Sequence, residues 1–530
     1  MIYDIESIIN QGRTKQFPSS LDDSQLKALG LIIKKVNSGG IALIQGPPGT
    51  GKTTLLREVI AKLYNTLDKD ECLVYIAPTN KLVADMLKAV VNIYTIHGKG
   101  TEDLKREVRV YGSKFRWGKY AKLNDKIDEN VKIVISTEYQ RFPIRNVRLH
   151  ILVDEASKSP LHRPFITIAN ELIRALEESS VKDLLMSLSV VGDPKQAIGL
   201  GAEFGTTYGR NLLLMINLIR GLLTFEGREV SYDVDITSEA RKYLRGKYYE
   251  FLNTTYRLPE PTESPISIGY YDGELRAHHR ASDVFKRFDV RDYIVEWARN
   301  QGDNLLNKAV ECVYEAVKTE RPLIYVHVKG LGFRNEYLRN SYVYYDEHRA
   351  RIGVAFASAL GLVTGTNVSV VTTYTDQWIQ MKLMYEQRYK PILKKMHPNV
   401  NIRFGTVHSF LGSEDENIVA ILGKEYIGAT STIINDWYVT MYFNEPEVLN
   451  VQLSRHKGLL VIIGNLARMV ISINSYRKRT FTLGYKELLE TAKAILERAG
   501  IKIKGNKVIR ERRDAEFMHI IADPNEGLIQ

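Results

Sequence analysis

Residues 40–67 contain the feature that most restricts how this 530-residue chain can fold. The run "GIALIQ" (40–45) has the character of a buried strand, "GPPGTGKT" (46–53) fits the pattern G-x-x-x-x-G-K-[ST], and "TTLLREVIAKLYNTL" (53–67) has apolar residues at helical spacing. Glycines let backbone N–H groups turn toward a phosphate, and the start of the following helix adds its dipole. The segment therefore predicts a phosphate-binding loop in an α/β fold.

The side chains of this loop have distinct expected roles. We expect Lys52 to reach the β- and γ-phosphates of a nucleotide and Thr53 to ligate Mg²⁺. The other expected nucleotide-binding positions are Gly46, Pro47, Pro48, Gly49, Thr50, Gly51 and Thr54.

A second apolar run, "LHILVDEAS" (149–157), ends in two acidic residues. Acids at the carboxyl end of a strand suit a site at the switch point of a parallel sheet. We expect Asp154 to hold Mg²⁺, directly or through water, and Glu155 to polarise the attacking water. A neighbouring Glu is typical of ATP hydrolysis, and no guanine-reading Asn-Lys-x-Asp follows, so the pattern favours an ATPase over a GTPase or kinase.

Four further segments contain candidate motifs, and in the last two of them a polar turn lies beside an apolar, β-like run. In "LSVVGDPKQAIG" (188–199), Gln196 can sense the γ-phosphate. The others are "LNTTYRLPEPTESPISIGYYDGEL" (252–275), "RFGTVHSFLGSEDENIVAILG" (403–423) and "VLNVQLSRHKGLLVIIGN" (448–465).

In this order, the motifs resemble those of superfamily-one helicases of the 1B type, in the branch with the up-frameshift RNA helicase of mRNA decay and senataxin. The resemblance covers about residues 18 to 465. It implies two RecA-like domains with ATP and Mg²⁺ between them, and 5′→3′ movement. It also implies that Gln25 reads adenine, Tyr256 stacks on it, Arg257 and Arg455 are arginine fingers, and Glu414 lies near the ribose and phosphates.

Three positions depart from the family pattern. Leu411 replaces a usual Gln, and Ser409 and His456 are unusual where they stand. These departures leave the ATP-binding motifs intact and concern the coupling to nucleic acid near residues 406–412.

The resemblance also places contacts to a nucleic-acid strand at the ends of several strands. The matching segments are "IAPTNKLVADML" (76–87), "YTIHG" (94–98), "ISTEYQ" (135–140), "VVTTYTDQ" (370–377) and the turn after 403. Ordinary loops are the alternative for each segment. The expected contact residues are Thr79, Asn80, Lys81, Thr95, His97, Thr137, Thr373, Thr406 and Ser409.

Residues 104–132 mix nine basic residues with aromatic ones. Such a mixture suits phosphate pairing and base stacking on a single strand. A small subdomain with its own aromatic core is the alternative, which we favour for Trp117. Contact with nucleic acid is favoured for Lys114, Arg116 and Lys119.

The fold class expected is α/β, with two tandem RecA-like domains of mainly parallel sheets. The first spans 1–250 with an insertion near 92–132, and the second spans 251–465 with a helical insertion near 276–320. A basic tail covers 466–530.

The composition agrees with a polyanionic partner, because Lys and Arg number 73 against 62 Asp and Glu. Sparse cysteine and an N-terminus without a sustained apolar stretch favour a cytoplasmic protein, and we expect a monomer. The apolar run 352–365 is too short to span a bilayer and predicts a buried helix.

These observations favour an ATP-dependent helicase or translocase on single-stranded DNA or RNA, or on a duplex with a single-stranded tail. A non-unwinding, ATP-gated clamp or protein-displacing remodeller fits the same motifs. A fused nuclease is the third possibility, although no acid–Lys cluster outside the ATP motifs requires it.

Overall fold

The computed structural model divides into two compact units, Met1–Asn253 (unit 1) and Thr254–Gln530 (unit 2). The expected boundary at 250/251 therefore falls three residues early. The structure describes residues 2–13, 20–127, 130–141, 147–166, 173, 177, 184–196, 213–231, 234–329, 334–338, 341–410, 412–423, 425, 442, 445–476, 485–504, 507–510, 515–523 and 527–529.

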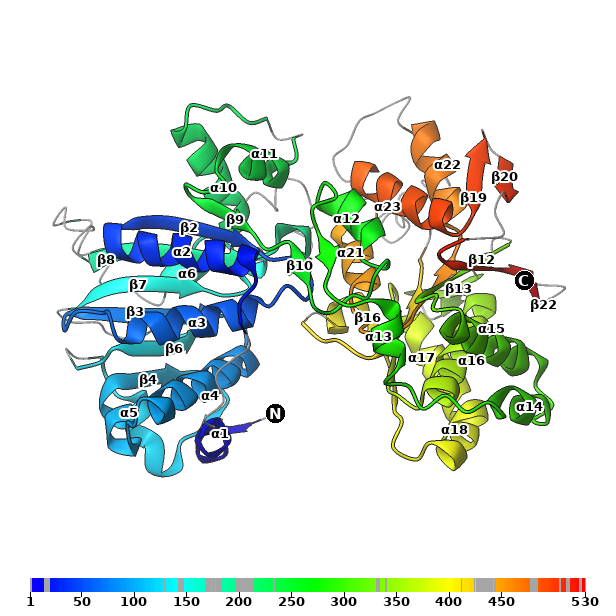
Figure 1. Ribbon diagram of the computed structural model, residues 1–530, viewed down its shortest axis with the longest axis horizontal. Coiled ribbons are helices and arrows are strands. Elements are labelled where there is room, and N and C mark those ends of the chain that lie inside the picture. Colours follow the sequence, from blue (N-terminus) through cyan, green and yellow to red (C-terminus); the bar gives the residue numbers. More distant parts are fainter. Residues whose placement is uncertain are drawn as a thin grey trace. The chain divides into compact units, whose positions relative to one another are not determined.

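Unit 1 is built on a seven-stranded sheet in which all neighbouring strands run parallel (Figure 1). In spatial order the strands are β4 (Val108–Tyr111), β6 (Ile133–Thr137), β3 (Glu71–Ala77), β7 (Arg148–Val153), β8 (Leu185–Gly192), β2 (Gly40–Gln45) and β9 (Tyr249–Phe251). Continuous β-branched and aliphatic runs suit such strands because both faces are covered.

Three helices pack on one face of this sheet: α2 (Asp23–Ser38), α3 (Lys52–Tyr64) and α4 (Asn80–Ile96) (Figure 1). The remaining described helices of the unit are α1 (Ile5–Gly12), α5 (Thr101–Glu107), α6 (Arg163–Ile166), α10 (Leu214–Phe225) and α11 (Ile236–Tyr243). A short pair, β1 (Tyr3–Asp4) and β5 (Phe115–Arg116), and the 3₁₀ turn η1 (Gly118–Asn124) complete it.

The segment expected as an insertion near 92–132 is partly integral to the sheet. Its strand β4 pairs with β6 in register, with Val108 opposite Ile133. The carboxyl end of α4 also lies within it. This strand was not predicted because only four residues, "VRVY", form it.

Unit 2 has a second seven-stranded sheet, parallel except for its last strand. In spatial order the strands are β16 (Ile402–Thr406), β15 (Val368–Thr372), β17 (Asn417–Ile421), β18 (Leu460–Gly464), β12 (Leu323–Val328), β21 (Met518–Asp523) and β22 (Gly527–Ile529). Two hairpins, β13–β14 (Arg334–Leu338, Ser341–Tyr345) and β19–β20 (Ile501–Lys504, Lys507–Arg510), stand apart, as does the pair β10–β11 (Thr254–Thr255, Arg276–Ala277).

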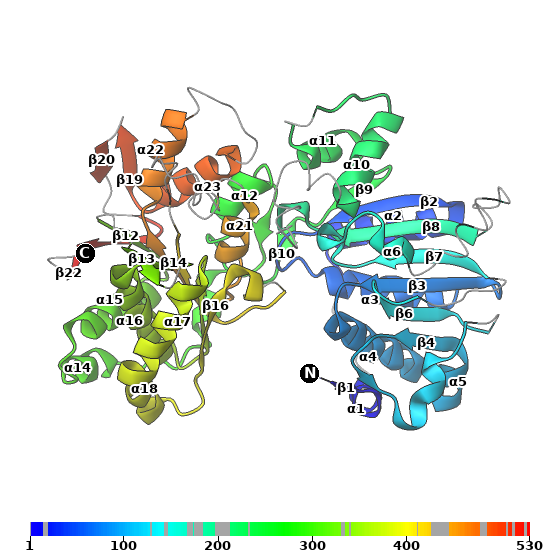
Figure 2. The ribbon, with the colours of Figure 1, turned by 180° about the vertical axis from the view of Figure 1, so that it is seen from behind.

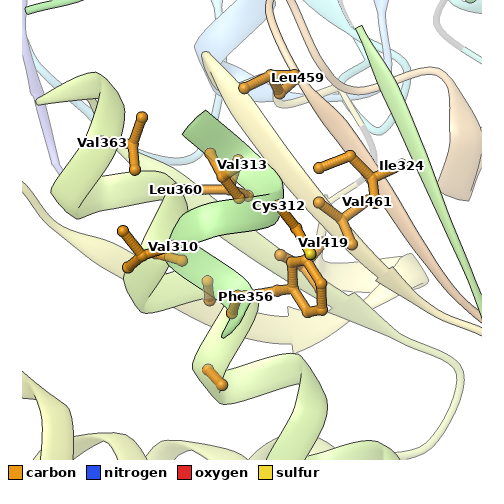
Figure 3. Packing of buried hydrophobic residues seen from close by; sticks show 14 of the residues in the cluster. Val310, Cys312, Val313, Ile324, Phe356, Leu360, Val363, Val419, Leu459 and Val461 are labelled. Atoms are coloured by element: carbon orange, nitrogen blue, oxygen red, sulfur yellow. The ribbon is translucent and has the colours of Figure 1, made fainter. Parts of the chain in front are cut away.

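The α-helices described in unit 2 are α12 (Ser264–Tyr270), α13 (Ala281–Phe285), α14 (Ile294–Arg299), α15 (Asn304–Lys318), α16 (Glu347–Thr364), α17 (Thr375–Met384), α18 (Lys390–Met396), α21 (Glu447–Leu453), α22 (Leu466–Tyr476) and α23 (Tyr485–Arg498). Figure 3 shows α15 and α16 packed together against the sheet, with Cys312 and Phe356 facing Val419 and Val461. The helical segment expected as an insertion near 276–320 thus supplies part of the core.

Helix α16 confirms the buried helix expected at 352–365. From Arg349 to Thr364 every residue except Arg351 is buried, and Gly365 ends the helix with φ of 65°. Among the described helices, none combines the length and the apolar character that crossing a membrane requires.

The segment after residue 465 is not a separate tail. Its strand β21 pairs in parallel with β12, with Ile324 opposite Met518, and β22 continues the sheet. Helix α23 packs against α12 and α22. Local sequence periodicity could not reveal this pairing, because β12 and β21 are about 190 residues apart.

Candidate functional site

The loop between β2 and α3 has backbone geometry that only glycine accommodates easily. Gly51 has φ of 75°, in the left-handed region, and a Cβ there would lie 2.4 Å from Gln25 Nε2. A Cβ on Gly46 would lie 2.5 Å from Lys52 Cγ. The two glycines therefore leave a cradle lined by main chain, as the motif predicts.

Hydrogen bonds between residues of the loop, and from Gln25 to the loop, fix the conformation of this cradle. Lys52 Nζ donates to the Gly46 carbonyl at 2.8 Å, and Thr50 Oγ1 donates to the Pro47 carbonyl at 2.9 Å. The buried Gln25 joins the loop to α2: its Nε2 donates to the Thr50 carbonyl at 3.0 Å, and its Oε1 accepts from the Asp22 N–H. The predicted adenine-reading residue is thus anchored directly to the phosphate loop.

Asp154 and Glu155 follow β7 at its carboxyl end. Asp154 is buried; its Oδ2 accepts from the Tyr75 hydroxyl at 2.7 Å and its Oδ1 accepts from the Glu155 N–H at 2.8 Å. Burial, and then the charge of Glu155, raise the pKa of Asp154 to about 6, although the nearby charge of Lys52 opposes the rise. The structure therefore places the predicted carboxylate beside the phosphate-loop lysine.

Two features of this strand end were not predicted. Tyr75 of β3 orients Asp154, and its position inside an apolar strand gave no signal of that role. Glu155 has φ of 50°, a left-handed conformation that costs energy for a non-glycine residue and is common at functional sites.

Gln196 lies on the short turn η3 (Pro194–Gln196) after β8, at the same carboxyl edge of the sheet. Its Nε2 donates to Asp193 Oδ2 at 2.7 Å, and both side chains are buried. The candidate γ-phosphate sensor thus has a fixed carboxylate partner.

Unit 2 gathers the predicted arginines and acid around one point. Arg257 Nε donates to Glu414 Oε2 at 2.8 Å, and its Nη1 donates to the Ser454 carbonyl at 3.1 Å. Arg455, which follows Ser454 in the sequence, is buried, and its Nε donates to the Val451 carbonyl at 3.2 Å. Residues nearly 200 positions apart in the sequence therefore meet.

Glu414 is the shared counter-ion of this cluster. Burial by itself would raise its pKa, but the charges of Arg257 and Lys457 and their hydrogen bonds outweigh burial and lower it. Lys457 was not predicted, and its place two residues after Arg455 was the available signal.

His456, singled out as a departure, has a definite structural place. It is buried, and its Nε2 forms a 2.7 Å hydrogen bond with Thr262 Oγ1. Burial, and then the charge of Arg257, lower the pKa of His456 to about 3. His456 thereby links the segment of Arg257 to that of Arg455. Leu411, another departure, lies outside the described residues.

Tyr256 directly precedes Arg257 in the sequence. Its ring contacts that of His278, with ring centroids 4.7 Å apart. The ring is half-buried, and its stacking on adenine stays a prediction.

Comparison with known proteins agrees with these motifs. Two family models, each described as an AAA domain, match residues 20–160 and 238–467. The MOV-10 protein of Gallus gallus, named as a helicase, is 23% identical over 84% of this chain and 44% of its own length. Regulator of nonsense transcripts 1 of Caenorhabditis elegans is 22% identical over 92% of this chain and 42% of its own length.

The chain belongs to the superfamily-one helicases. Within them it falls in the branch of the up-frameshift RNA helicase, as the ordered motifs indicated. The chain spans less than half the length of these curated relatives.

The solved structure of an arterivirus helicase, nonstructural protein 10, in complex with DNA covers 83% of this chain and 62% of its own. The identity is 12% and the TM-score 0.33, too low to support any argument about function.

Some strand-contact positions expected from this family lie together in unit 1. Thr79 and Lys81 are exposed at the start of α4, directly after β3, and Thr137 ends the neighbouring strand β6. Thr79 Oγ1 also caps α4 by accepting from the Leu82 N–H at 3.3 Å. These residues share the carboxyl edge of the sheet, as expected.

Thr95 and His97 do not lie at a strand end, so that expectation is corrected. Thr95 is inside α4 and donates to the Val91 carbonyl at 2.8 Å, and His97 follows the last residue of the helix. They occupy the opposite end of the helix from Thr79, roughly 25 Å away for a 17-residue helix. No glycine or proline stands between Asn80 and His97 to mark an earlier helix end, so the sequence concealed how far the helix continues.

The basic and aromatic segment shows both expected characters. Trp117 is partly buried against the core of unit 1, with its ring 5.8 Å from Phe115, which confirms the packing role. Lys114, Arg116 and Lys119 are exposed, and Lys119 pairs with Glu6.

Asn80 connects this segment to the start of α4. Its Oδ1 accepts from the Lys114 N–H at 3.4 Å, and its Nδ2 donates to Ser113 Oγ at 3.5 Å. The turn that carries Ser113 and Lys114 therefore lies beside Thr79 and Lys81.

The expected contacts of unit 2 also gather at one sheet edge. Thr373 follows β15 and Thr406 ends the adjacent β16, with Thr372 opposite Thr406. The exposed Ser409 donates to the Thr406 carbonyl at 2.7 Å.

Proposed function

We propose that this chain is an ATP-driven helicase or translocase that acts on single-stranded DNA or RNA. Its membership of the superfamily-one helicases supports this function. The observation that carries the proposal is the gathering of Arg257, Glu414 and Arg455 in unit 2 of a chain whose unit 1 holds the phosphate loop. A protein that only bound a nucleotide would not need that second cluster.

In unit 1 the proposed work is phosphate binding and water activation. The Lys52 ammonium exchanges the Gly46 carbonyl for phosphate oxygens, and the N-terminus of α3 adds its dipole. Glu155 orients the attacking water, and Gln196 responds to the γ-phosphate. The nucleotide base is bound by Gln25 and Tyr256.

The donor atoms fit Mg²⁺. Thr53 lies in the first turn of α3 and supplies a hydroxyl, and Asp154 supplies a buried carboxylate that Tyr75 and the Glu155 N–H orient. Oxygen donors of this kind are the ones Mg²⁺ prefers. When bound, the ion neutralises phosphate charge, and its own charge favours ionised Asp154.

Arg257 and Arg455 are proposed to stabilise the charge that develops on the γ-phosphate during hydrolysis. Glu414 and the Ser454 carbonyl keep Arg257 extended and partly desolvated, and carbonyl groups do the same for Arg455. Such preorganisation lowers the cost of reaching the transition state.

The proposed strand contacts are Thr79, Asn80, Lys81, Lys114, Arg116 and Thr137 in unit 1, with Thr373, Thr406 and Ser409 in unit 2. Hydroxyl, amide and backbone groups at strand ends bind phosphates without reading sequence. Movement is proposed to run 5′→3′, in line with the family resemblance, and the protein is proposed to work as a monomer.

Unwinding of tailed duplexes tests the proposal. Purified protein with ATP and Mg²⁺ is given DNA, RNA and hybrid duplexes that carry either a 5′ or a 3′ single-stranded tail. Strand separation of 5′-tailed substrates, together with ATP hydrolysis stimulated by single strands, is expected. Stimulated hydrolysis with no strand separation on any substrate would overturn the helicase function in favour of an ATP-gated clamp. Separation of only 3′-tailed substrates would overturn the polarity.

A further inference from the structure

A buried hydrogen-bonded network lies beneath the candidate phosphate sensor. Gln45, the last residue of β2, is fully buried directly before the phosphate loop. Its Nε2 donates to Asp193 Oδ1 at 3.0 Å, and its Oε1 accepts from Arg241 Nη1 at 2.9 Å and from the Tyr249 hydroxyl. The other Asp193 oxygen, Oδ2, accepts from Gln196 Nε2 at 2.7 Å.

The groups at the two ends of this network fix the direction of its hydrogen bonds. A guanidinium can only donate hydrogen bonds, and an ionised carboxylate can only accept them. The Gln45 amide must therefore turn its oxygen to Arg241 and its nitrogen to Asp193. Asp193, held in this way, presents its second oxygen to Gln196 and orients that amide in turn.

The network ends in elements remote from the phosphate loop in sequence. Arg241 belongs to α11 and lies over the Phe251 ring of β9, 5.2 Å from its centroid. Figures 1 and 2 both show α10 and α11 beside β9 at one end of the sheet. A second bond joins the sensor turn to α11, because Lys195 Nζ donates to Asp235 Oδ2 at 2.8 Å and Asp235 caps that helix.

We propose that Arg241 is a positioning residue for ATP hydrolysis, which acts through Gln45 and Asp193 to hold the Gln196 amide in its working orientation. The inference rests on the proposed function, since it takes Gln196 as the γ-phosphate sensor. Only Leu252 and Asn253 separate β9 from the first residue of unit 2, so the same network ties the sensor to the segment that leads into unit 2.

Removal of Arg241 leaves the Gln45 amide without a fixed orientation. The Tyr249 hydroxyl can donate or accept, so the amide can rotate and bring its oxygen against the Asp193 carboxylate. Asp193 then loses a donor, and the anchoring of Gln196 weakens. The bonds of the phosphate loop itself do not involve Arg241.

The test compares Arg241→Met with Lys242→Met in steady-state ATP hydrolysis at saturating single-stranded DNA or RNA. Both variants lose one positive charge from α11, but Lys242 is exposed. In Arg241→Met we expect kcat to fall at least about tenfold, with the KM for ATP within about twofold of wild type, because misplacement of a catalytic group lowers turnover more than binding. Lys242→Met should behave as wild type.

Coupling to Gln196 separates positioning from general damage to the fold. If Arg241 acts through Gln196, then Gln196→Ala combined with Arg241→Met should be no slower than Gln196→Ala alone. Additive losses, or wild-type kcat in Arg241→Met, would overturn the inference.

Gln45→Glu gives the same test without a change of size, should Arg241→Met fail to fold. The ionised carboxylate of this variant cannot donate a hydrogen bond to Asp193. The kcat of the variant should therefore fall as it does in Arg241→Met. Undiminished kcat in Gln45→Glu would also overturn the inference. A wild-type protein with no stimulated ATP hydrolysis would instead overturn the proposed function, which distinguishes the two failures.

Discussion

The pH dependence of unfolding should expose the buried His456. Its pKa is about 3 in the folded chain, against about 6.5 for an unperturbed histidine, because the ring is buried and lies near the charge of Arg257. The unfolded chain therefore binds a proton at a pH where the folded chain does not, and stability falls as the pH drops below 6.5. At pH 5, which is 1.5 units below the pKa of a histidine in the unfolded chain, protonation stabilises the unfolded state. The free energy of unfolding should therefore be about 2 kcal/mol lower than at pH 8 from this group alone.

Urea denaturation of the full chain and of His456→Gln at pH 8 and pH 5 isolates this contribution. Tryptophan emission follows mainly unit 2, which contains Trp297, Trp378 and Trp437 of the four tryptophans. The Gln side chain is neutral at both pH values, so the wild type should lose about 2 kcal/mol more than the variant between pH 8 and pH 5.

The exposed His278, replaced in the same way, provides the control. His278→Gln should keep the wild-type pH dependence. A wild-type and a His456→Gln protein that lose equal stability over this range would refute the reasoning, because the buried ring would then be protonated as easily as a solvated one.

Three further outcomes are expected. Lys52→Ala should abolish ATP hydrolysis while single-strand binding, measured by fluorescence anisotropy, stays within a few-fold of wild type; normal turnover would contradict the phosphate-loop assignment. Arg455→Ala should cut kcat by about 10³ with a smaller change in ATP affinity, and a near-normal rate would remove it from the reaction. Gly51→Ala should lower the free energy of unfolding by more than the roughly 1–2 kcal/mol that the left-handed backbone conformation costs an alanine, because the new Cβ would lie 2.4 Å from Gln25 Nε2. Gly302→Ala, with φ of 71° and open space around it, should show only the backbone cost in thermal unfolding, so equal effects would contradict the contact.

Local motifs predicted much of the site. Lys52, Asp154 and Gln196 each follow an apolar run that ends in polar residues, and each lies at the carboxyl edge of the first sheet. The meeting of Arg257, Glu414 and Arg455 followed from family resemblance, since nothing in the spacing of residues so far apart fixes their contact.

Other features could not be predicted from local pattern. The pairing of β21 with β12 is set by which strand edge stays open after the rest of the sheet has formed, and that is a property of the whole fold. Thr95 was misplaced because helix α4 lacks a terminating glycine or proline before Gly98. Gln45 and Arg241 were missed because a polar residue at the end of an apolar strand, and an arginine on a short helix, both look like ordinary surface residues until burial is known.

The late return of β21 to β12 bears on how the protein is made. Until residues 518–523 arrive, one edge of β12 presents unpaired N–H and C=O groups along "LIYVHV", a strand rich in β-branched residues. At ordinary translation rates, the roughly 190 intervening residues take about 10 to 40 s to synthesise. During that interval the second sheet is open at an apolar edge, so the nascent chain is vulnerable to pairing with other strands before its own partner emerges.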